Sequence, residues 1–206
     1  LADFKAKTKV IPFGINSLPW TELQPEFGNS FLFVGRLVPY KGLEVLLDAL
    51  KNIPGCRLDV VGQGPLKGSL EKRICLGDLA GRVTMHGACN SGQLSSLMTQ
   101  ARALVLPSLD QSETFGLVQL EAMASGIPVI ASDLPSGVSE VGEEGKTCLL
   151  VPPGDSAALS RAMLSILRDD ELAKAMGRAS RKRFENNFTR EIMVHRILKW
   201  YHQLLD

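Results

Sequence analysis

The chain has 206 residues, 45% of them apolar and 6% aromatic, which is the composition of a folded globular domain rather than of a disordered or fibrous protein. Its formal net charge of +1 provides no general attraction to nucleic acid or to an acidic membrane surface. No apolar run reaches the ~18 residues that a membrane-spanning helix needs, and residues 1–9 carry three lysines without the apolar stretch of a signal peptide.

Short apolar runs alternate with helical stretches along most of the chain. The expected strands are 31–35, 57–62, 83–87, 103–107, 128–131 and 148–151, and the expected helices between and after them are 42–51, 65–77, 91–101, 115–125 and 155–168. Strands that alternate with helices predict βαβ units, and therefore an α/β domain with a parallel sheet, helices on both faces and a ligand crevice at the carboxyl ends of the strands.

Local signals mark where these helices begin. Pro65 is expected in the first turn of its helix, Ser91 and Thr114 are expected to be N-caps, and Asp155 is expected to be an acidic cap.

The pattern changes after residue 168, where two helices (170–184 and 189–205) follow without a strand. The last helix carries an apolar stripe, which we expect to pack back on the body or on another domain. We therefore divide the chain into a leading segment (1–30), a sheet domain (31–187) and a C-terminal helix (188–206).

Charged clusters on these helices have simple explanations. The acidic run Asp169-Asp170-Glu171 is expected to cap a helix rather than to bind a metal. The basic cluster on the same helix is expected to be a solvated face, with contact to anionic lipid as the alternative; it comprises Arg178, Arg181, Lys182 and Arg183.

The cysteines and histidines do not form a metal site in the sequence pattern. There is no C-x-x-C pair, and the three histidines have no metal-ligand spacing to Cys56, Cys75, Cys89 and Cys148. We expect reduced cysteines, a cytoplasmic protein and no bound metal.

The first strand ends in residues suited to a phosphate. Gly35 and Arg36 follow it, and Lys41 precedes a helix, so a guanidinium, an ammonium and a helix N-terminus are expected near one another. The alternative is a solvated pair of surface cations beside a turn.

Gly62 and Gly64 follow the second strand and would allow a ligand to approach the backbone closely. A dinucleotide-binding G-x-G-x-x-G pattern would need a third glycine where the chain has Lys67, so simple turn chemistry is the alternative.

The strongest signal is the stretch from Glu113 to Glu121. An N-cap at Thr114 would leave N–H groups among residues 115–117 free to face an anion. Glu121 is the one charge in an otherwise apolar helix, where a carboxylate is costly unless it is paired, and sugar hydroxyls are suitable donors. The alternative is a glutamate that reaches solvent at the helix edge.

Together these residues resemble the C-terminal domain of the retaining GT-B glycosyltransferases, the large family four (glycosyl transferases group 1). Pro12-Phe13-Gly14-Ile15-Asn16 also resembles the segment that enters this domain from the N-terminal one. The resemblance implies a Rossmann-like sheet, and it covers about residues 10–205.

The resemblance also implies roles for particular residues. Arg36 and Lys41 would hold the donor diphosphate, Glu113 would contact the transferred hexose, and Glu121 would bind the ribose hydroxyls. The backbone amides after the first glutamate, those of Phe115, Gly116 and Leu117, would meet phosphate and sugar. The base would lie near the ends of the second and third strands, where the candidates are Gly62, Met85, His86 and Gly87. We interpret His86 as an ordinary histidine at a strand end, with contact to the base as the alternative. Ser136 to Glu140 resembles a family loop but has Val138 where that loop has glycine.

The implied reaction is hexose transfer from a nucleoside diphosphate sugar of the GDP-mannose or UDP-glucose type to an acceptor hydroxyl, with retention of configuration. The implied partners are the nucleotide sugar, an acceptor sugar or lipid-linked glycan, and an N-terminal domain, without which the isolated chain would transfer little. No further cofactor is expected, and the location would be cytoplasmic, with peripheral contact to the inner membrane as an option. The alternatives are a non-catalytic sugar-nucleotide-binding module, an epimerase or a phosphorylase.

Overall fold

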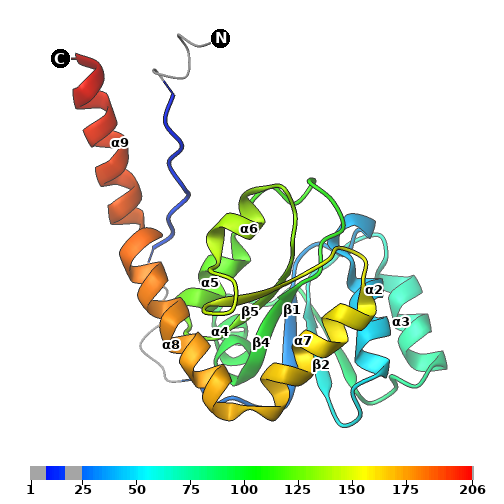
Figure 1. Ribbon diagram of the computed structural model, residues 1–206. Helices are drawn as coiled ribbons and strands as arrows, with labels where there is room; N and C mark the ends of the chain where they lie inside the picture. The colour runs from blue at the N-terminus through cyan, green and yellow to red at the C-terminus, as the bar shows by residue number, and fades with distance from the viewer. Residues whose placement is uncertain (1–7, 17–24, 206) are drawn as a thin grey trace.

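The computed structural model describes residues 8–16 and 25–205. The prediction that residues 1–9 are not a signal peptide therefore falls largely outside the described part. Within that part a six-stranded parallel sheet carries helices on both faces (Figure 1). The strand order is β3-β2-β1-β4-β5-β6, which confirms the predicted Rossmann-like α/β class. The strands are β1 (Ser30–Val34), β2 (Arg57–Val61), β3 (Val83–Gly87), β4 (Ala101–Leu106), β5 (Val129–Ser132) and β6 (Cys148–Val151).

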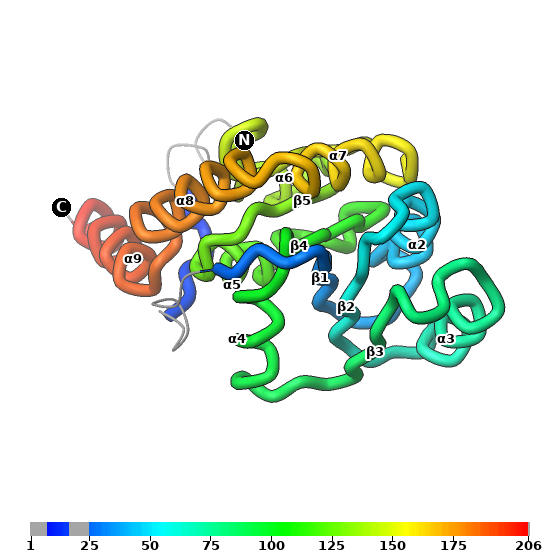
Figure 2. Tube along the Cα trace, turned by 90° about the horizontal axis from the view of Figure 1, so that it is seen from below, coloured from blue at the N-terminus to red at the C-terminus, as the bar shows by residue number. Residues whose placement is uncertain are grey.

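Alternating side chains of the central strands build a core on each face of the sheet. Phe31 and Phe33 join one buried cluster with α2 and α7, whereas Leu32 points to the opposite face and joins the cluster that includes α5 and α6. Figure 2 shows the sheet between these two helical layers. The helical elements are η1 (Pro39–Lys41), α2 (Leu43–Lys51), α3 (Lys67–Leu76), α4 (Ser91–Gln100), α5 (Val118–Ala124), α6 (Gly137–Val141), α7 (Ser156–Arg168), α8 (Asp170–Asn187) and α9 (Arg190–Leu205).

Two of the predicted helix starts are confirmed. The carboxylate of Asp155 accepts a hydrogen bond from the Ala158 N–H at 2.8 Å, and that of Asp169 accepts one from the Leu172 N–H at 2.9 Å. The acidic run at 169–171 is therefore a helix cap, as predicted.

The other predicted starts are wrong in position. Asn90, not Ser91, caps α4, and it forms a reciprocal pair of hydrogen bonds with Gln93 because its backbone is still extended there. Thr114 does not cap α5, which begins only at Val118, because Gly116 adopts a left-handed φ of 68° that interrupts a helical path. Pro65 likewise precedes α3, which begins at Lys67.

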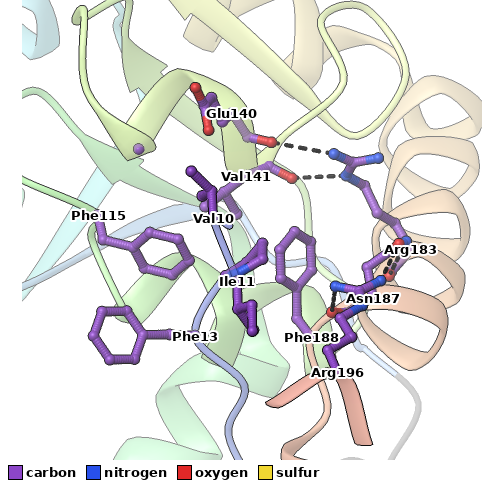
Figure 3. A pocket seen from close by; sticks show the side chains of 12 residues that line it. Val10, Ile11, Phe13, Phe115, Glu140, Val141, Arg183, Asn187, Phe188 and Arg196 are labelled. Atoms are coloured by element: carbon purple, nitrogen blue, oxygen red, sulfur yellow. Dashed lines mark hydrogen bonds between the residues drawn. The ribbon is translucent and has the colours of Figure 1, made fainter. Parts of the chain in front are cut away.

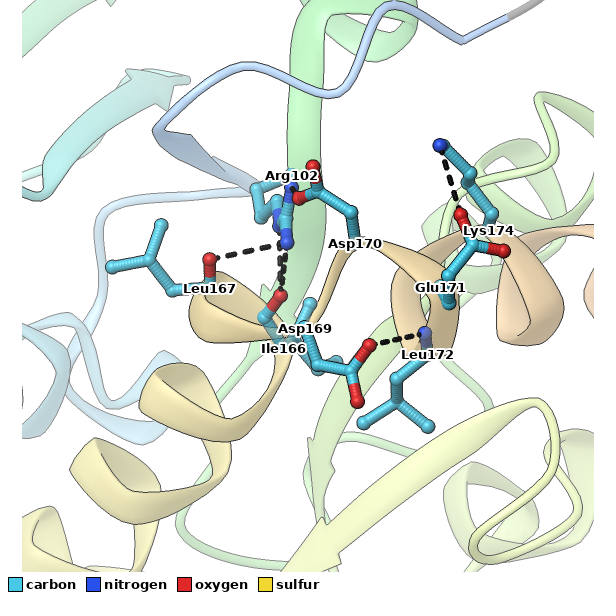
Figure 4. A network of polar contacts seen from close by, with 8 residues as sticks. All are labelled: Arg102, Ile166, Leu167, Asp169, Asp170, Glu171, Leu172 and Lys174. Atoms are coloured by element: carbon cyan, nitrogen blue, oxygen red, sulfur yellow. Dashed lines mark hydrogen bonds and ion pairs between the residues drawn. The ribbon is translucent and has the colours of Figure 1, made fainter.

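An arginine on the central strand β4 connects the end of α7 to the start of α8. The Arg102 side chain is 2% exposed and donates to the carbonyl of Ile166 at 2.8 Å and to that of Leu167 at 3.1 Å (Figure 4). It also donates to the Asp170 carboxylate at 2.6 Å, and this hydrogen bond lowers the pKa of Asp170. Arg102 thus satisfies the last carbonyls of α7 and fixes where α8 begins.

The helix α9 leaves the body of the domain beside the leading segment (Figure 1). None of its residues is buried, and its apolar side chains Val194, Leu198, Tyr201, Leu204 and Leu205 are 40–84% exposed. Ile192 and Ile197 of the stripe are half-buried, so the body covers it only in part, and packing of the exposed side chains on another domain stays a prediction. No helix of the described residues has the length and apolar character to cross a membrane.

We expect Arg102→Ala to lower the free energy of unfolding by about 3 kcal/mol, because it leaves buried carbonyls without a donor. Urea unfolding at neutral pH measures this loss. Arg168→Ala removes an exposed arginine from the same helix end and should change stability by less than about 0.5 kcal/mol. Equal losses in the two variants would contradict the role of the Arg102 network.

Candidate functional site

The predicted site lies where the strand order changes direction. From the neighbouring strands β1 and β4 the chain continues outward in opposite directions, to β2 and to β5. A ligand crevice is expected between the loops that leave β1 and β4, at the carboxyl edge of the sheet. Gly35, Arg36 and Lys41 belong to the first loop, and Ser108 and Glu113 belong to the second.

Two glycines let neighbouring loops touch backbone to backbone: Gly42 joins the β1 loop to the β4 loop, and Gly62 joins the β2 loop to the β1 loop. Gly42 has a φ of 67°, and a Cβ on it would lie 1.9 Å from the Pro107 carbonyl oxygen. Gly62 has a φ of 144°, and a Cβ on it would lie 1.8 Å from the Gly35 carbonyl oxygen. These glycines are thus needed for contact between the loops, a role that the sequence pattern did not suggest.

The loops bring Lys41 and Glu113 into direct contact. The Lys41 ammonium pairs with Glu113 Oε2, and the Ser108 hydroxyl donates to the same oxygen at 2.9 Å. The side chains of Lys41 and Glu113 are 12% and 8% exposed, so each charge is largely removed from water and depends on the other. The residues predicted to hold diphosphate and hexose are therefore neighbours.

Arg36 differs from Lys41 in being exposed. It makes no hydrogen bond or ion pair with the described residues, so its five N–H donors are free to bind a ligand. The Leu37 N–H donates to the Gln63 carbonyl at 2.9 Å, which holds the loop of Arg36 against the loop that carries Gly62 and Gly64.

The loop after Glu113 presents unsatisfied donors. The N–H groups of Thr114, Phe115, Gly116 and Leu117 donate no hydrogen bond to the described residues. The sequence pattern predicts free N–H groups at 115–117, but through a cap that Thr114 does not form. Successive unpaired N–H groups before a helix are a suitable environment for an anion.

Glu121 lies in the first turn of α5, after this loop. It is partly buried, and its carboxylate makes no hydrogen bond or ion pair with the described residues. Burial raises the pKa of Glu121 above the ordinary value of 4.5. An unpaired carboxylate in this place can accept hydrogen bonds from hydroxyl groups.

His86 is directed away from this cluster. Its Nε2 lies 2.6 Å from Asp59 Oδ1 on the face of the sheet, and Ser30 donates to the other carboxylate oxygen of Asp59. Only the backbone of the β3 end reaches the crevice loops, through the Gly87 carbonyl, which accepts from the Gly62 N–H at 2.7 Å. Contact between the His86 side chain and a base stays a prediction.

A cavity of about 410 Å³ lies beside the loop that carries Phe115 (Figure 3). Its walls come from the leading segment, from α6 and from the junction of α8 and α9. Arg183 donates to the Val141 carbonyl at 2.7 Å, so this member of the basic cluster is a structural residue rather than a purely solvated one.

The sequence pattern gave no role to Ser108 or Asp59. Ser108 follows a buried strand by two residues, a position that the rule of ligands at carboxyl ends could have indicated. Asp59 contacts His86, a residue on another strand, for which the pattern has no signal. No group of three or more His, Cys, Asp or Glu side chains in the described part of the chain could hold a metal ion.

Comparison with known proteins supports one family. The family model described as Glycosyl transferases group 1 matches residues 16–183. The chain is 33% identical over 218 residues to O-antigen chain mannosyltransferase C of Escherichia coli, which covers 100% of this chain and 57% of that protein. It is 37% identical over 172 residues to a phosphatidyl-myo-inositol mannosyltransferase of Mycobacterium leprae, over 79% of this chain and 45% of that protein.

A solved structure agrees with these relatives. Sucrose-phosphate synthase from Thermosynechococcus elongatus has a TM-score of 0.83 and 32% identity to this chain, and the match covers 96% of this chain and 53% of that one. The chain thus spans about half the length of these relatives. It belongs to the group 1 glycosyltransferases and forms the C-terminal domain of their GT-B fold.

Proposed function

We propose that this domain binds a nucleoside diphosphate sugar of the GDP-mannose or UDP-glucose type for transfer of the hexose to an acceptor hydroxyl, with retention of configuration. One observation carries the proposal most strongly. Lys41 pairs with Glu113, and the loops that carry these two residues also carry Arg36 and a row of N–H groups without a partner among the described residues. A ligand with a diphosphate and neighbouring hydroxyls matches these groups.

In this proposal Arg36 and Lys41 bind the diphosphate and stabilise the negative charge that grows on it as the glycosidic bond breaks. Lys41 exchanges part of its contact with Glu113 for a phosphate oxygen. The Glu113 carboxylate, still held by Ser108, then accepts a hexose hydroxyl. Glu121 accepts the ribose hydroxyls, and the N–H groups of residues 115–117 meet phosphate and sugar. The reaction needs neither a metal nor a further cofactor.

We further propose that a preceding domain of the same protein completes the active site and covers the exposed stripe of α9. The relatives are nearly twice as long as this chain, which supports such a domain. Their names include two mannosyltransferases and a sucrose-phosphate synthase, so we leave the acceptor as a sugar or a lipid-linked glycan.

A cytoplasmic location fits the four cysteines, all of which are unpaired. Peripheral contact with the inner membrane would rest on Arg178 and Lys182, the exposed members of the basic cluster.

Donor binding tests the site directly. We expect Arg36→Ala to weaken binding of the nucleotide sugar by about 1–3 kcal/mol, roughly 5- to 150-fold, because charge-assisted hydrogen bonds to phosphate are lost. Titration calorimetry against UDP-glucose, GDP-mannose and UDP-N-acetylglucosamine measures this. Arg57→Ala removes an exposed arginine at the opposite edge of the sheet and should leave the affinity unchanged. Wild-type affinity in both Arg36→Ala and Glu121→Gln would contradict the site.

Glu121 should also show a conflict between stability and binding. Because burial raises its pKa in the folded state, the protonated form is favoured, and this stabilisation is complete below pH 4.5 and lost as the pH rises through the raised pKa. Glu121→Gln stays neutral, so we expect it to be more stable than the wild type at pH 7, with the difference shrinking as the pH falls through the raised pKa towards 4.5, while it binds donor less tightly. Urea unfolding across this pH range measures the effect, and Glu185→Gln, at an exposed position, is the control. A less stable variant at pH 7 would contradict the assignment.

Transfer itself should require the preceding domain. We expect the 206-residue chain to bind donor but to release little hexose to any acceptor, because half of the crevice is missing. Addition of the preceding domain, fused or in trans, should restore transfer in a radiolabelled-donor assay. Rapid transfer by the chain alone would refute the two-domain proposal. Conversion of the donor without an acceptor would identify an epimerase, and binding without transfer by both domains together would identify a binding module.

A further inference from the structure

We propose that Phe13 is a positioning residue for the donor loop (residues 113–117), an inference that rests on the proposed function. Phe13 belongs to the leading segment and lies about a hundred positions before the loop in the chain. Its ring meets the ring of Phe115 edge to face, with centroids 5.5 Å apart and an angle of 72° between the planes (Figure 3). Phe13 remains 59% exposed, so this contact, rather than burial in the core, describes its environment.

The backbone that carries Phe13 is fixed to the body of the domain. The Ile15 N–H donates to the Phe188 carbonyl at 3.0 Å, and the Arg190 N–H donates back to the Ile15 carbonyl at 2.9 Å. Gly14 lies so close to the same junction that a Cβ on it would be 2.3 Å from the Thr189 carbonyl oxygen. The backbone next to Phe13 is therefore fixed by hydrogen bonds to the α8–α9 junction.

The opposite side of the donor loop is also held. The Gly137 N–H donates to the Thr114 carbonyl at 2.9 Å, and a Cβ on Gly137 would lie 2.8 Å from the Phe115 ring. Gln119 donates to the Phe115 carbonyl at 3.1 Å. Phe115 thus lies between α6 on one side and Phe13 on the other.

The contact matters because the N–H groups of residues 114–117 have no partner of their own among the described residues. A loop whose own N–H groups make no hydrogen bond depends more strongly on what packs around it. By closing the free side of Phe115, Phe13 holds these N–H groups in the direction in which they would meet the diphosphate and hexose. Preorganised donors bind more tightly than donors that must be ordered by the ligand.

The test compares Phe13→Ala with Phe13→Tyr, which keeps the ring, and with Leu198→Ala, which removes a similarly exposed apolar side chain from α9. We expect Phe13→Ala to weaken binding of whichever nucleotide sugar the wild type binds by roughly 3- to 10-fold, a change that corresponds to about 0.7–1.4 kcal/mol. Binding of the corresponding nucleoside should be unchanged, since it uses Glu121 rather than the loop. Phe13→Tyr should restore the affinity, and Leu198→Ala should leave it unaltered.

A second measurement needs no ligand. Hydrogen exchange followed by mass spectrometry should show faster exchange of the Gly137 and Gln119 amides, which donate to the loop carbonyls of Thr114 and Gly116, in Phe13→Ala than in the wild type or in Phe13→Tyr. Wild-type affinity for the nucleotide sugar in Phe13→Ala, or equal weakening for the nucleoside, would overturn the inference while leaving the proposed function in place. If the wild-type chain binds no nucleotide sugar, the proposed function fails, and the exchange result alone then decides: unchanged exchange in Phe13→Ala overturns the positioning role, and faster exchange supports it.

Discussion

The site depends on the close approach of two loops that leave neighbouring strands. Where Gly42 meets the Pro107 carbonyl there is no room for a side chain, so the backbone at the start of α2 packs directly on the backbone that follows β4. This contact brings Lys41 to Glu113 and leaves both with little access to water. In such surroundings a cation and a carboxylate stabilise each other far more than they would in solution. The geometry of the backbone is thus the cause of the electrostatics.

The neutral Lys41–Glu113 pair and the unpaired donors beside it favour a ligand that carries both phosphate and hydroxyl groups. The Lys41–Glu113 pair presents no net charge, whereas Arg36 and the N–H groups of residues 114–117 present only donors. An anion is therefore attracted first by the exposed guanidinium and the loop, and it must then compete with Glu113 for the ammonium. A ligand that brings both phosphate for Lys41 and a hydroxyl for Glu113 replaces the broken contact on both sides. Phosphate alone leaves the Glu113 carboxylate with the Ser108 hydroxyl but without a cation, at a cost.

The alternation of apolar runs and helical stretches was enough to predict the sheet, its parallel strands and the strand ends that carry Arg36 and Glu113. Local sequence could not predict the contact between Lys41 and Glu113, because 72 positions separate them and only the strand order makes them neighbours. The wrong cap at Thr114 has a similar origin, since the left-handed Gly116 reflects packing against Leu106 rather than local propensity. Likewise, His86 pairs with Asp59, a residue on another strand.

Arg102 and Glu121 are both withdrawn from water, but only Arg102 has partners in the protein that compensate for this. Arg102 is buried, and its guanidinium contacts two carbonyls and a carboxylate, so folding itself compensates for its loss of water. Glu121 is also withdrawn from water, yet no described residue compensates it, and its raised pKa reflects that cost. A group that destabilises the empty protein can be compensated only by something that binds. The contrast therefore favours Glu121 as a ligand-binding residue over a glutamate that merely reaches solvent at the helix edge.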